Sequence, residues 1–288
     1  MNAWLTAAGS VVLVAALSPS LSGQWPRRQE AGVPRTPDGK TNLTAPAPKA
    51  PDGHPDLSGV WENLGWREGA AAGGSISGTG GAPGSRSADS RRPPAPSIAM
   101  FFDIGTGVPG GLPFQPWARE LKNKRTADNA KDNPDAHCLP LGNMQLHLHP
   151  EPRKIIQTPK ELVILYEGNG GVREIFTDGR ALPVNDPQPW WFGYSIGKWV
   201  GDTLVVETSG FRDGGWLDVN GSPLTDKGKM TERLRRVNYG TLEIELTVDD
   251  PRAYTRPWTV TVTQRLMPDD DLIEFVCQEN ERSSAHFK

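Results

Sequence analysis

The second half of the chain alternates apolar and polar residues with a period of two, which is typical of β-strands with one buried face. The pattern is clearest at 258–263 and at 241–248, where polar residues alternate with Leu242, Ile244, Leu246 and Val248. It predicts strands at 57–62, 154–158, 162–167, 172–177, 191–199, 203–208, 230–237, 241–248, 258–266 and 272–277.

Short turn sequences separate many of these strands. They are Gly168-Asn169-Gly170-Gly171, Gly201-Asp202, Asn238-Tyr239-Gly240 and Pro268-Asp269-Asp270-Asp271, and such residues favour tight hairpins. The sequence contains no βαβ pattern and no Gly-rich phosphate loop. We therefore expect a mainly β fold, an antiparallel meander that forms a curled sheet or barrel, with one short helix that begins near Pro116.

The first part of the chain has a different composition. Residues 4–17 are apolar and are followed by small residues, which predicts a signal peptide at 1–23 and a periplasmic or secreted protein with no transmembrane span after its removal. An uncleaved N-terminal anchor is the alternative. Residues 24–56 are Pro-rich and are expected to be a disordered linker, followed by one domain at 57–288. Within that domain, 68–98 has the Gly, Ser and Pro content of a flexible loop.

Two cysteines, Cys138 and Cys277, lie in the expected domain. In an oxidising compartment such a pair is most simply a disulfide, and the alternatives are two buried thiols or a metal-binding or catalytic cysteine.

The overall charge excludes one class of partner. The chain has 288 residues, of which 36% are hydrophobic and 23% charged, and its formal net charge is -3. This is the composition of an ordinary globular protein, and it gives no electrostatic reason to expect nucleic-acid binding.

Two resemblances follow from short motifs. Gly59-Val60-Trp61, followed by an antiparallel meander, resembles the lipocalin-like (calycin-like) arrangement, which implies that Trp61 plugs one end of a ligand-binding barrel.

The second resemblance covers nearly the whole chain after residue 54 and is to a large family of uncharacterised exported bacterial proteins. It rests on 55–61, 112–118, 137–140, 154–159, 176–180, 193–199, 201–208, 249–254 and 257–260. It implies an exported domain of this size. Similar members often have histidines around 222–231, where this chain has none.

Aromatic residues are the first candidates for binding. The chain has 10 Trp but only 4 Tyr, and three Trp fall in expected loops or strand entrances. Flat exposed rings suit stacking on apolar or aromatic molecules. We therefore expect ligand-binding roles for Trp190, Trp191, Trp216 and Tyr166, whereas Trp61, Trp199 and Trp258 are expected in the core.

Charged residues in the strand region are candidates for catalysis. A carboxylate inside a barrel, beside an arginine and a tyrosine, could act as a general acid or base. The candidate catalytic residues are Glu167, Arg173, Tyr194 and Glu232. The simpler interpretation is that charged residues such as these form cross-strand ion pairs on the outer face. Ser195 lies inside an expected hairpin, which argues against a serine-hydrolase elbow.

His147 and His149 lie on one side of an expected extended segment, with Glu151 following. This spacing can chelate zinc or copper, but surface histidines in an irregular loop are the simpler interpretation.

These observations predict an exported protein that holds a small apolar or aromatic molecule in a β-barrel pocket or at its Trp-rich mouth, without a cofactor. One alternative is a cofactor-free lyase, isomerase or hydrolase on the same fold. The other is a module that binds glycans or envelope proteins.

Overall fold

The computed structural model describes residues 31–64, 98–184 and 189–277. The expected signal peptide, the first part of the linker and nearly all of the expected loop at 68–98 lie outside these residues.

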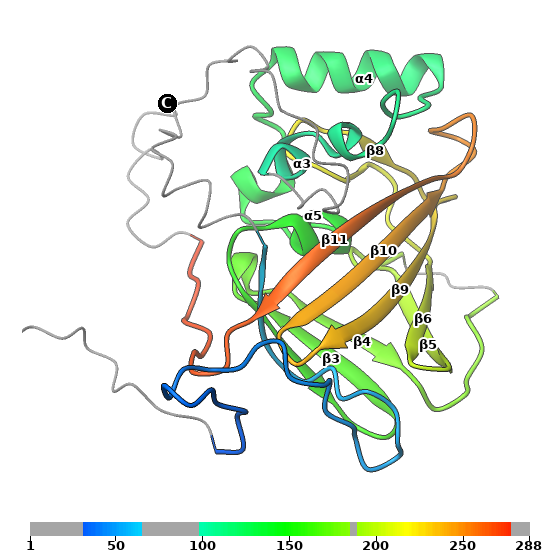
Figure 1. The fold of residues 1–288 in the computed structure, drawn as a ribbon. Helices are drawn as coiled ribbons and strands as arrows, with labels where there is room; N and C mark the ends of the chain where they lie inside the picture. The colour runs from blue at the N-terminus through cyan, green and yellow to red at the C-terminus, as the bar shows by residue number, and fades with distance from the viewer. Residues whose placement is uncertain (1–30, 65–97, 185–188, 278–288) are drawn as a thin grey trace, which may run out of the picture.

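Within the described residues, nine strands close into a barrel in the order β1-β11-β10-β9-β6-β5-β4-β3-β2 (Figure 1). The predicted barrel is thus confirmed. The strands are β1 (Gly59–Asn63), β2 (Arg153–Gln157), β3 (Glu161–Tyr166), β4 (Val172–Phe176), β5 (Tyr194–Val200), β6 (Thr203–Ser209), β9 (Lys229–Asn238), β10 (Thr241–Asp249) and β11 (Trp258–Leu266). The short strands β7 (Gly215–Trp216) and β8 (Pro223–Leu224) pair with each other outside the barrel.

The barrel closes through β1, which pairs with β2 on one side and with β11 on the other. The expected strand at 272–277 is wrong, because that segment is irregular. β1 already pairs with Gln264–Leu266 at the end of β11, which is where a hairpin strand that follows β11 would begin to pair.

One neighbouring pair is parallel rather than antiparallel. Ile175 on β4 lies beside Ser195 on β5, and Phe176 lies beside Ile196. A parallel pair requires the chain to return to the end of the barrel at which β4 begins, and such a return takes about a dozen residues or more. The sequence between Phe176 and Tyr194 is long enough for this.

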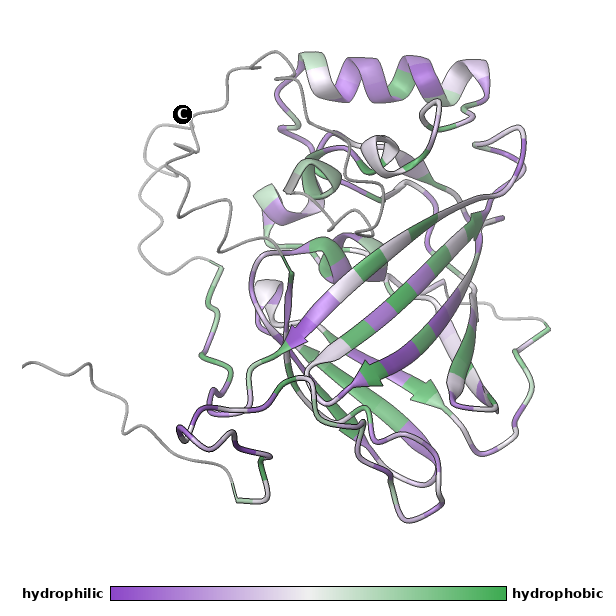
Figure 2. Cartoon of the chain, viewed as in Figure 1, coloured by the Kyte–Doolittle hydropathy of each residue, from purple (hydrophilic) through white to green (hydrophobic). Residues whose placement is uncertain are grey.

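The strands place apolar residues inside and polar residues outside. The inward residues of β10 are at most 1% exposed, and Figure 2 shows the resulting alternation as bands along the front strands. Fully burying one such aliphatic side chain stabilises the fold by about 1.5–3 kcal/mol. Outer ion pairs join Arg233 to Glu245 and Arg235 to Glu243 across β9 and β10, as the sequence predicts for most charged strand residues.

Trp61 is fully buried and pairs with Leu266, whose backbone N–H donates to the carbonyl of Gly240 in the turn between β9 and β10. This turn lies at the lower end of the barrel in Figure 1. The indole Nε1 of Trp61 donates to the carbonyl of Leu57 at 3.0 Å, and the guanidinium of Arg236 lies 5.0 Å from the ring centre. The same guanidinium lies 5.2 Å from the ring of Tyr239. Trp61 is therefore a core plug, as expected.

The described part of the expected linker, 31–56, has no helix or regular strand, but it is bound to the barrel. Tyr239 and Gly240 donate backbone hydrogen bonds to the carbonyls of Ala45 and Leu43. His54 stacks on Trp199 with ring centres 4.7 Å apart. Residues 31–56 thus cover the lower end of the barrel.

Helices gather at the opposite end (Figure 1). They are α3 (Ile98–Phe102), α4 (Pro116–Ala127) and α5 (Asn143–Leu148), with short 3-10 turns η1 (Ile104–Gly107), η2 (Pro134–His137) and η3 (Gly168–Gly170). The predicted helix at Pro116 is confirmed as α4, which has proline at its first turn. The sequence pattern gives no signal for α5, because its polar residues Asn143, Gln145 and His147 alternate with apolar ones, a period of two that is typical of a strand. The expected extended segment at His147 is therefore wrong, since this residue lies in a helix.

Cys138 and Cys277 form the expected disulfide, with their Cα atoms 5.7 Å apart. The bond ties the segment that follows β11 to the loop between η2 and α5. No helix among the described residues is long and apolar enough to cross a membrane.

Candidate functional site

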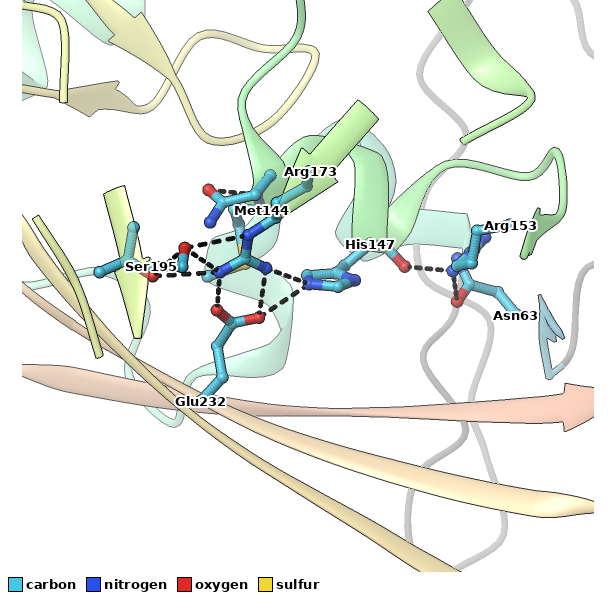
Figure 3. A network of polar contacts seen from close by, with 9 residues as sticks. Asn63, Met144, His147, Arg153, Arg173, Ser195 and Glu232 are labelled. Atoms are coloured by element: carbon cyan, nitrogen blue, oxygen red, sulfur yellow. Dashed lines mark hydrogen bonds and ion pairs between the residues drawn. The ribbon is translucent and has the colours of Figure 1, made fainter. Parts of the chain in front are cut away.

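The upper end of the barrel contains a buried polar network built around α5 (Figure 3). His147 of α5 contacts Glu232 of β9, with Nε2 2.8 Å from Oε1. Arg173 of β4 donates from Nη1 to the same oxygen at 2.9 Å and pairs through Nη2 with Oε2. All three side chains are at most 1% exposed.

Hydroxyl groups complete the surroundings of Arg173. Its Nη2 donates to Ser195 Oγ and to Thr208 Oγ1, each at 3.0 Å. The two hydroxyl oxygens lie 2.9 Å apart. The guanidinium is therefore held by four strands of the barrel, β4, β5, β6 and β9.

A second buried arginine binds the backbone at the C-terminal end of α5. Arg153 Nη1 donates to Asn63 Oδ1 and to the carbonyl of His147, and its Nη2 donates to the carbonyl of His149. Cations are favourable at the C-terminal end of a helix, where carbonyl groups lack partners. Burial lowers the pKa of Arg153 to about 10, which still leaves it charged at neutral pH.

The network fixes the protonation states of its members. Burial lowers the pKa of His147 below 6.5, so the imidazole is neutral at pH 7. Burial also acts to raise the pKa of Glu232, but Arg173 and His147 together outweigh it and hold that pKa below its usual 4.5. The network is thus a buried ion pair with a neutral histidine beside it.

The neutral imidazole has one proton, and its position follows from the neighbours. A carboxylate only accepts hydrogen bonds, so Nε2 must carry the proton that lies between His147 and Glu232. Nδ1 is then an acceptor, and it is buried without a hydrogen-bond partner among the described residues. A carboxylate–imidazole pair of this kind can serve as a general base, but only where a substrate can reach it.

Lowering the pH from 7 to 5 is expected to reduce the free energy of unfolding. His147 stays neutral in the folded chain while it takes up a proton in the unfolded chain below about 6.5, so its contribution is lost as the pH falls through that value. The slope should reach at most about 1.4 kcal/mol per pH unit. Below about 4.5, Glu232 adds a second loss of the same sign, because its folded-state pKa is lowered.

Urea unfolding at pH 7, 6 and 5 measures this slope. The variant His147→Gln should show a flatter dependence between pH 6.5 and 5 than the wild-type chain. Equal slopes in the two proteins would mean that the titration of His147 is not coupled to folding.

The structure brings together two of the four predicted catalytic residues. Arg173 and Glu232 pair inside the barrel rather than on the outer face. Tyr194 instead receives a hydrogen bond from Arg180 at 3.1 Å, and Glu167 accepts one from the backbone of Ile273 at 3.0 Å. The sequence did contain a signal for Glu232, because it lies two residues from both Met230 and Leu234 and therefore shares their inner face.

The two predicted metal ligands point to different partners. His147 contacts Glu232, whereas His149 pairs through Nδ1 with Glu151. No group of three or more His, Cys, Asp or Glu side chains suited to a metal forms within the described parts of the chain.

The predicted aromatic residues separate into three environments. Trp191 and Trp216 line one hollow beside α4, which we call the α4 groove. Trp190 lies outside it and packs against Tyr194, with ring centres 5.4 Å apart. Tyr166 is buried inside the barrel against His147, and burial raises its pKa to about 12.

The α4 groove has a volume of about 380 Å³. Its apolar lining consists of Leu121, Pro134, Leu139, Trp191 and Trp216. Trp216 is more buried than its expected loop position suggested, at 4% exposure, because the guanidinium of Arg125 stacks on it at 4.3 Å from the ring centre.

Charged residues surround the apolar part of the groove. They are Lys124, Arg125, Asp128, Asp132 and Asp213. Arg125 is fixed by donating from Nη1 to the carbonyl of Gly221 at 3.0 Å, and burial lowers its pKa to about 10. The walls of the groove come from separate parts of the chain, namely α4, the disulfide loop and the segments around Trp191 and Trp216. The groove therefore exists only in the folded chain.

A smaller hollow, the inner pocket, adjoins the α4 groove and shares Pro134, Trp191 and Trp216 with it. Its volume is about 10 Å³. Asn143, the first residue of α5, lines this pocket and is fully buried. Its Nδ2 has no hydrogen-bond partner among the described residues. Leaving a buried donor without a partner lowers the free energy of unfolding by about 1–3 kcal/mol. Nothing in the local sequence pattern around Asn143 places this residue at a pocket.

Comparisons with protein-family models, with curated proteins and with solved structures find no match for this chain. The roles of these residues therefore follow from geometry and chemistry alone.

Proposed function

We propose that this chain is an exported binding protein that holds a small apolar or aromatic molecule in the α4 groove, whose lining residues lie on α4, on β7 and on segments outside the barrel strands. The observation that carries the proposal is the pairing of Trp191 and Trp216 in one hollow of about 380 Å³. That volume falls within the range of about 300–1,000 Å³ usual for small-molecule sites.

The chemistry of the lining fits such a ligand. Two indoles and three aliphatic side chains provide apolar contact, while charged groups at the edge can fix an orientation. The groove is also built on rigid parts of the fold, since α4 is anchored by Arg125 and the neighbouring loop is closed by the disulfide.

The expectation of export, to the periplasm or the medium, remains part of the proposal. It is supported by the Cys138–Cys277 disulfide, which is characteristic of oxidising compartments, and by the apolar stretch at 4–17. The proposed membership of a family of exported bacterial proteins with a lipocalin-like domain rests on the motifs between residues 55 and 260, and the closed barrel is compatible with it.

We do not propose catalysis by the polar network. Arg173 and Glu232 are bonded to each other and line neither the α4 groove nor the inner pocket, so a ligand in these hollows does not contact them. The network is better suited to holding α5 at the upper end of the barrel.

The neutral aromatic probe 2-naphthol is expected to bind the full chain, and Trp191→Ala should weaken this binding about tenfold, because it removes one stacking wall. Isothermal titration calorimetry measures the effect. Trp190→Ala is the matched control, since its neighbouring indole lies outside the groove, and it should bind as the wild-type chain does.

Absence of 2-naphthol binding would contradict the proposal. Binding of an oligosaccharide in its place, lost in Trp191→Ala, would favour the glycan-binding alternative.

A further inference from the structure

The inner pocket contains two features that select the same kind of chemical group. The first is Asn143, whose side chain is fully buried. Its Oδ1 accepts a hydrogen bond from the backbone of Met144 at 3.1 Å, which sets the orientation of the amide. Nδ2 is therefore a donor, and it has no partner among the described residues.

The second feature is the charge at this pocket. Of the described residues that line it, Arg212 alone is charged. Its guanidinium lies 5.0 Å from the ring centre of Trp191, so it stands beside the indole shared with the α4 groove. Asp128, Asp132 and Asp213, by contrast, line only the α4 groove. A donor and a cation together favour an oxygen acceptor, and most of all an anionic one.

The size of the pocket limits what can enter it. A volume of about 10 Å³ accommodates a group about as large as one water molecule. A single oxygen of a carboxylate or carbonyl meets this limit, whereas a ring does not. The ring system of a ligand would have to remain in the larger groove.

We infer that the ligand of the α4 groove is an aromatic or planar apolar carboxylate, whose oxygen accepts a hydrogen bond from Asn143 Nδ2 while its ring contacts Trp191 and Trp216. This inference rests on the proposed function and adds the chemical class of the ligand. Arg212 contributes by attracting the carboxylate to the pocket, and Asn143 contributes the direct hydrogen bond.

Two probes of similar shape and opposite charge test the inference. They are 2-naphthoate and 2-naphthylmethylammonium, titrated calorimetrically into the full chain. The wild-type chain should bind 2-naphthoate at least about tenfold more tightly, since only this probe offers an acceptor and a negative charge.

Two variants test whether Asn143 and Arg212 cause the preference for 2-naphthoate. Asn143→Asp replaces the donor by an acceptor of the same shape, and it should abolish the preference for 2-naphthoate. Arg212→Gln changes an exposed residue and should fold normally, so it tests the inference even if Asn143→Asp does not fold. It should reduce the preference about fivefold or more. Arg233→Gln, on the outer face of the barrel, is the matched control and should leave the preference unchanged.

The possible results distinguish a failure of the proposed function from a failure of the carboxylate inference. If neither probe binds, the proposed function itself is contradicted. If both bind equally well, or if Arg212→Gln leaves their ratio unchanged, the carboxylate inference is overturned while the groove remains a binding site. A ratio that falls in Arg212→Gln but not in Arg233→Gln supports the inference.

Discussion

Replacing Glu232 by Gln is expected to lower the free energy of unfolding by about 3–5 kcal/mol, because it leaves the buried charge of Arg173 without its counterion. The side chain of Glu232 is fully buried and contacts both Arg173 and His147. Gln has nearly the same shape, so the loss reports charge and hydrogen bonding rather than a cavity. Urea unfolding at pH 7 measures the change.

The neighbouring strand pair offers a matched control. Arg235 and Glu243 form an ion pair on the exposed face of β9 and β10, and Glu243→Gln should cost at most about 1 kcal/mol. The double variant Arg173→Met with Glu232→Leu should recover much of the stability lost in Glu232→Gln, because it removes both buried charges. If Glu232→Gln were as mild as Glu243→Gln, the network would not stabilise the barrel, and a functional role for it would have to be reconsidered.

Trp61→Ala is expected to destabilise the chain by a similar amount, about 3–5 kcal/mol, which is the usual cost of removing a large buried aromatic side chain. The variant opens a cavity at the lower end of the barrel and removes the ring over which Arg236 lies. Arg236 is itself largely buried, so its guanidinium would lose a favourable cation–π contact.

Trp117→Ala is the comparison for this second variant. Trp117 is 41% exposed on α4, where its indole donates one hydrogen bond to the carbonyl of Arg252. Its removal should cost about 1 kcal/mol. Thermal and urea unfolding should therefore show that Trp61→Ala is clearly less stable than Trp117→Ala. Equal stabilities would show that the buried Trp61 side chain does not stabilise the barrel.

The strands of the barrel were predictable because their signal is local. Alternating residues and tight turns lie within a few positions of one another, so β9, β10 and β11 could be placed to within a residue or two. The fully inward face of β10 follows from the same alternation. The plug role of Trp61 was predictable from its place in the first strand.

The features that the sequence did not reveal depend on distant residues. Pairing of β1 with β11 joins residues about two hundred positions apart, as Trp61 and Leu266 show. The parallel contact of β4 with β5 depends on the course of a long connection. The short helix α5 has no helical period, since its polar and apolar residues alternate and all six are buried.

In the candidate site, too, some residues have a local sequence signal and others depend on distant parts of the chain. Trp191 and Trp216 could be identified from their unusual residue type, but the opposite wall of the α4 groove comes from a helix and a disulfide loop far away in sequence. Asn143 is recognisable only when its burial and its unpartnered donor are known. Trp190 has the same sequence context as Trp191, yet it faces Tyr194 rather than the groove.

The indole N–H signals of the uniformly ¹⁵N-labelled chain report where a bound aromatic molecule lies. Trp191→Phe and Trp216→Phe assign the two groove signals, and Trp61→Phe and Trp258→Phe assign two signals from the barrel interior. On saturation with 2-naphthoate, the signals of Trp191 and Trp216 should move while those of Trp61 and Trp258 stay in place. Movement confined to Trp61 and Trp258 would contradict the account, because it would place the molecule inside the barrel and not in the α4 groove.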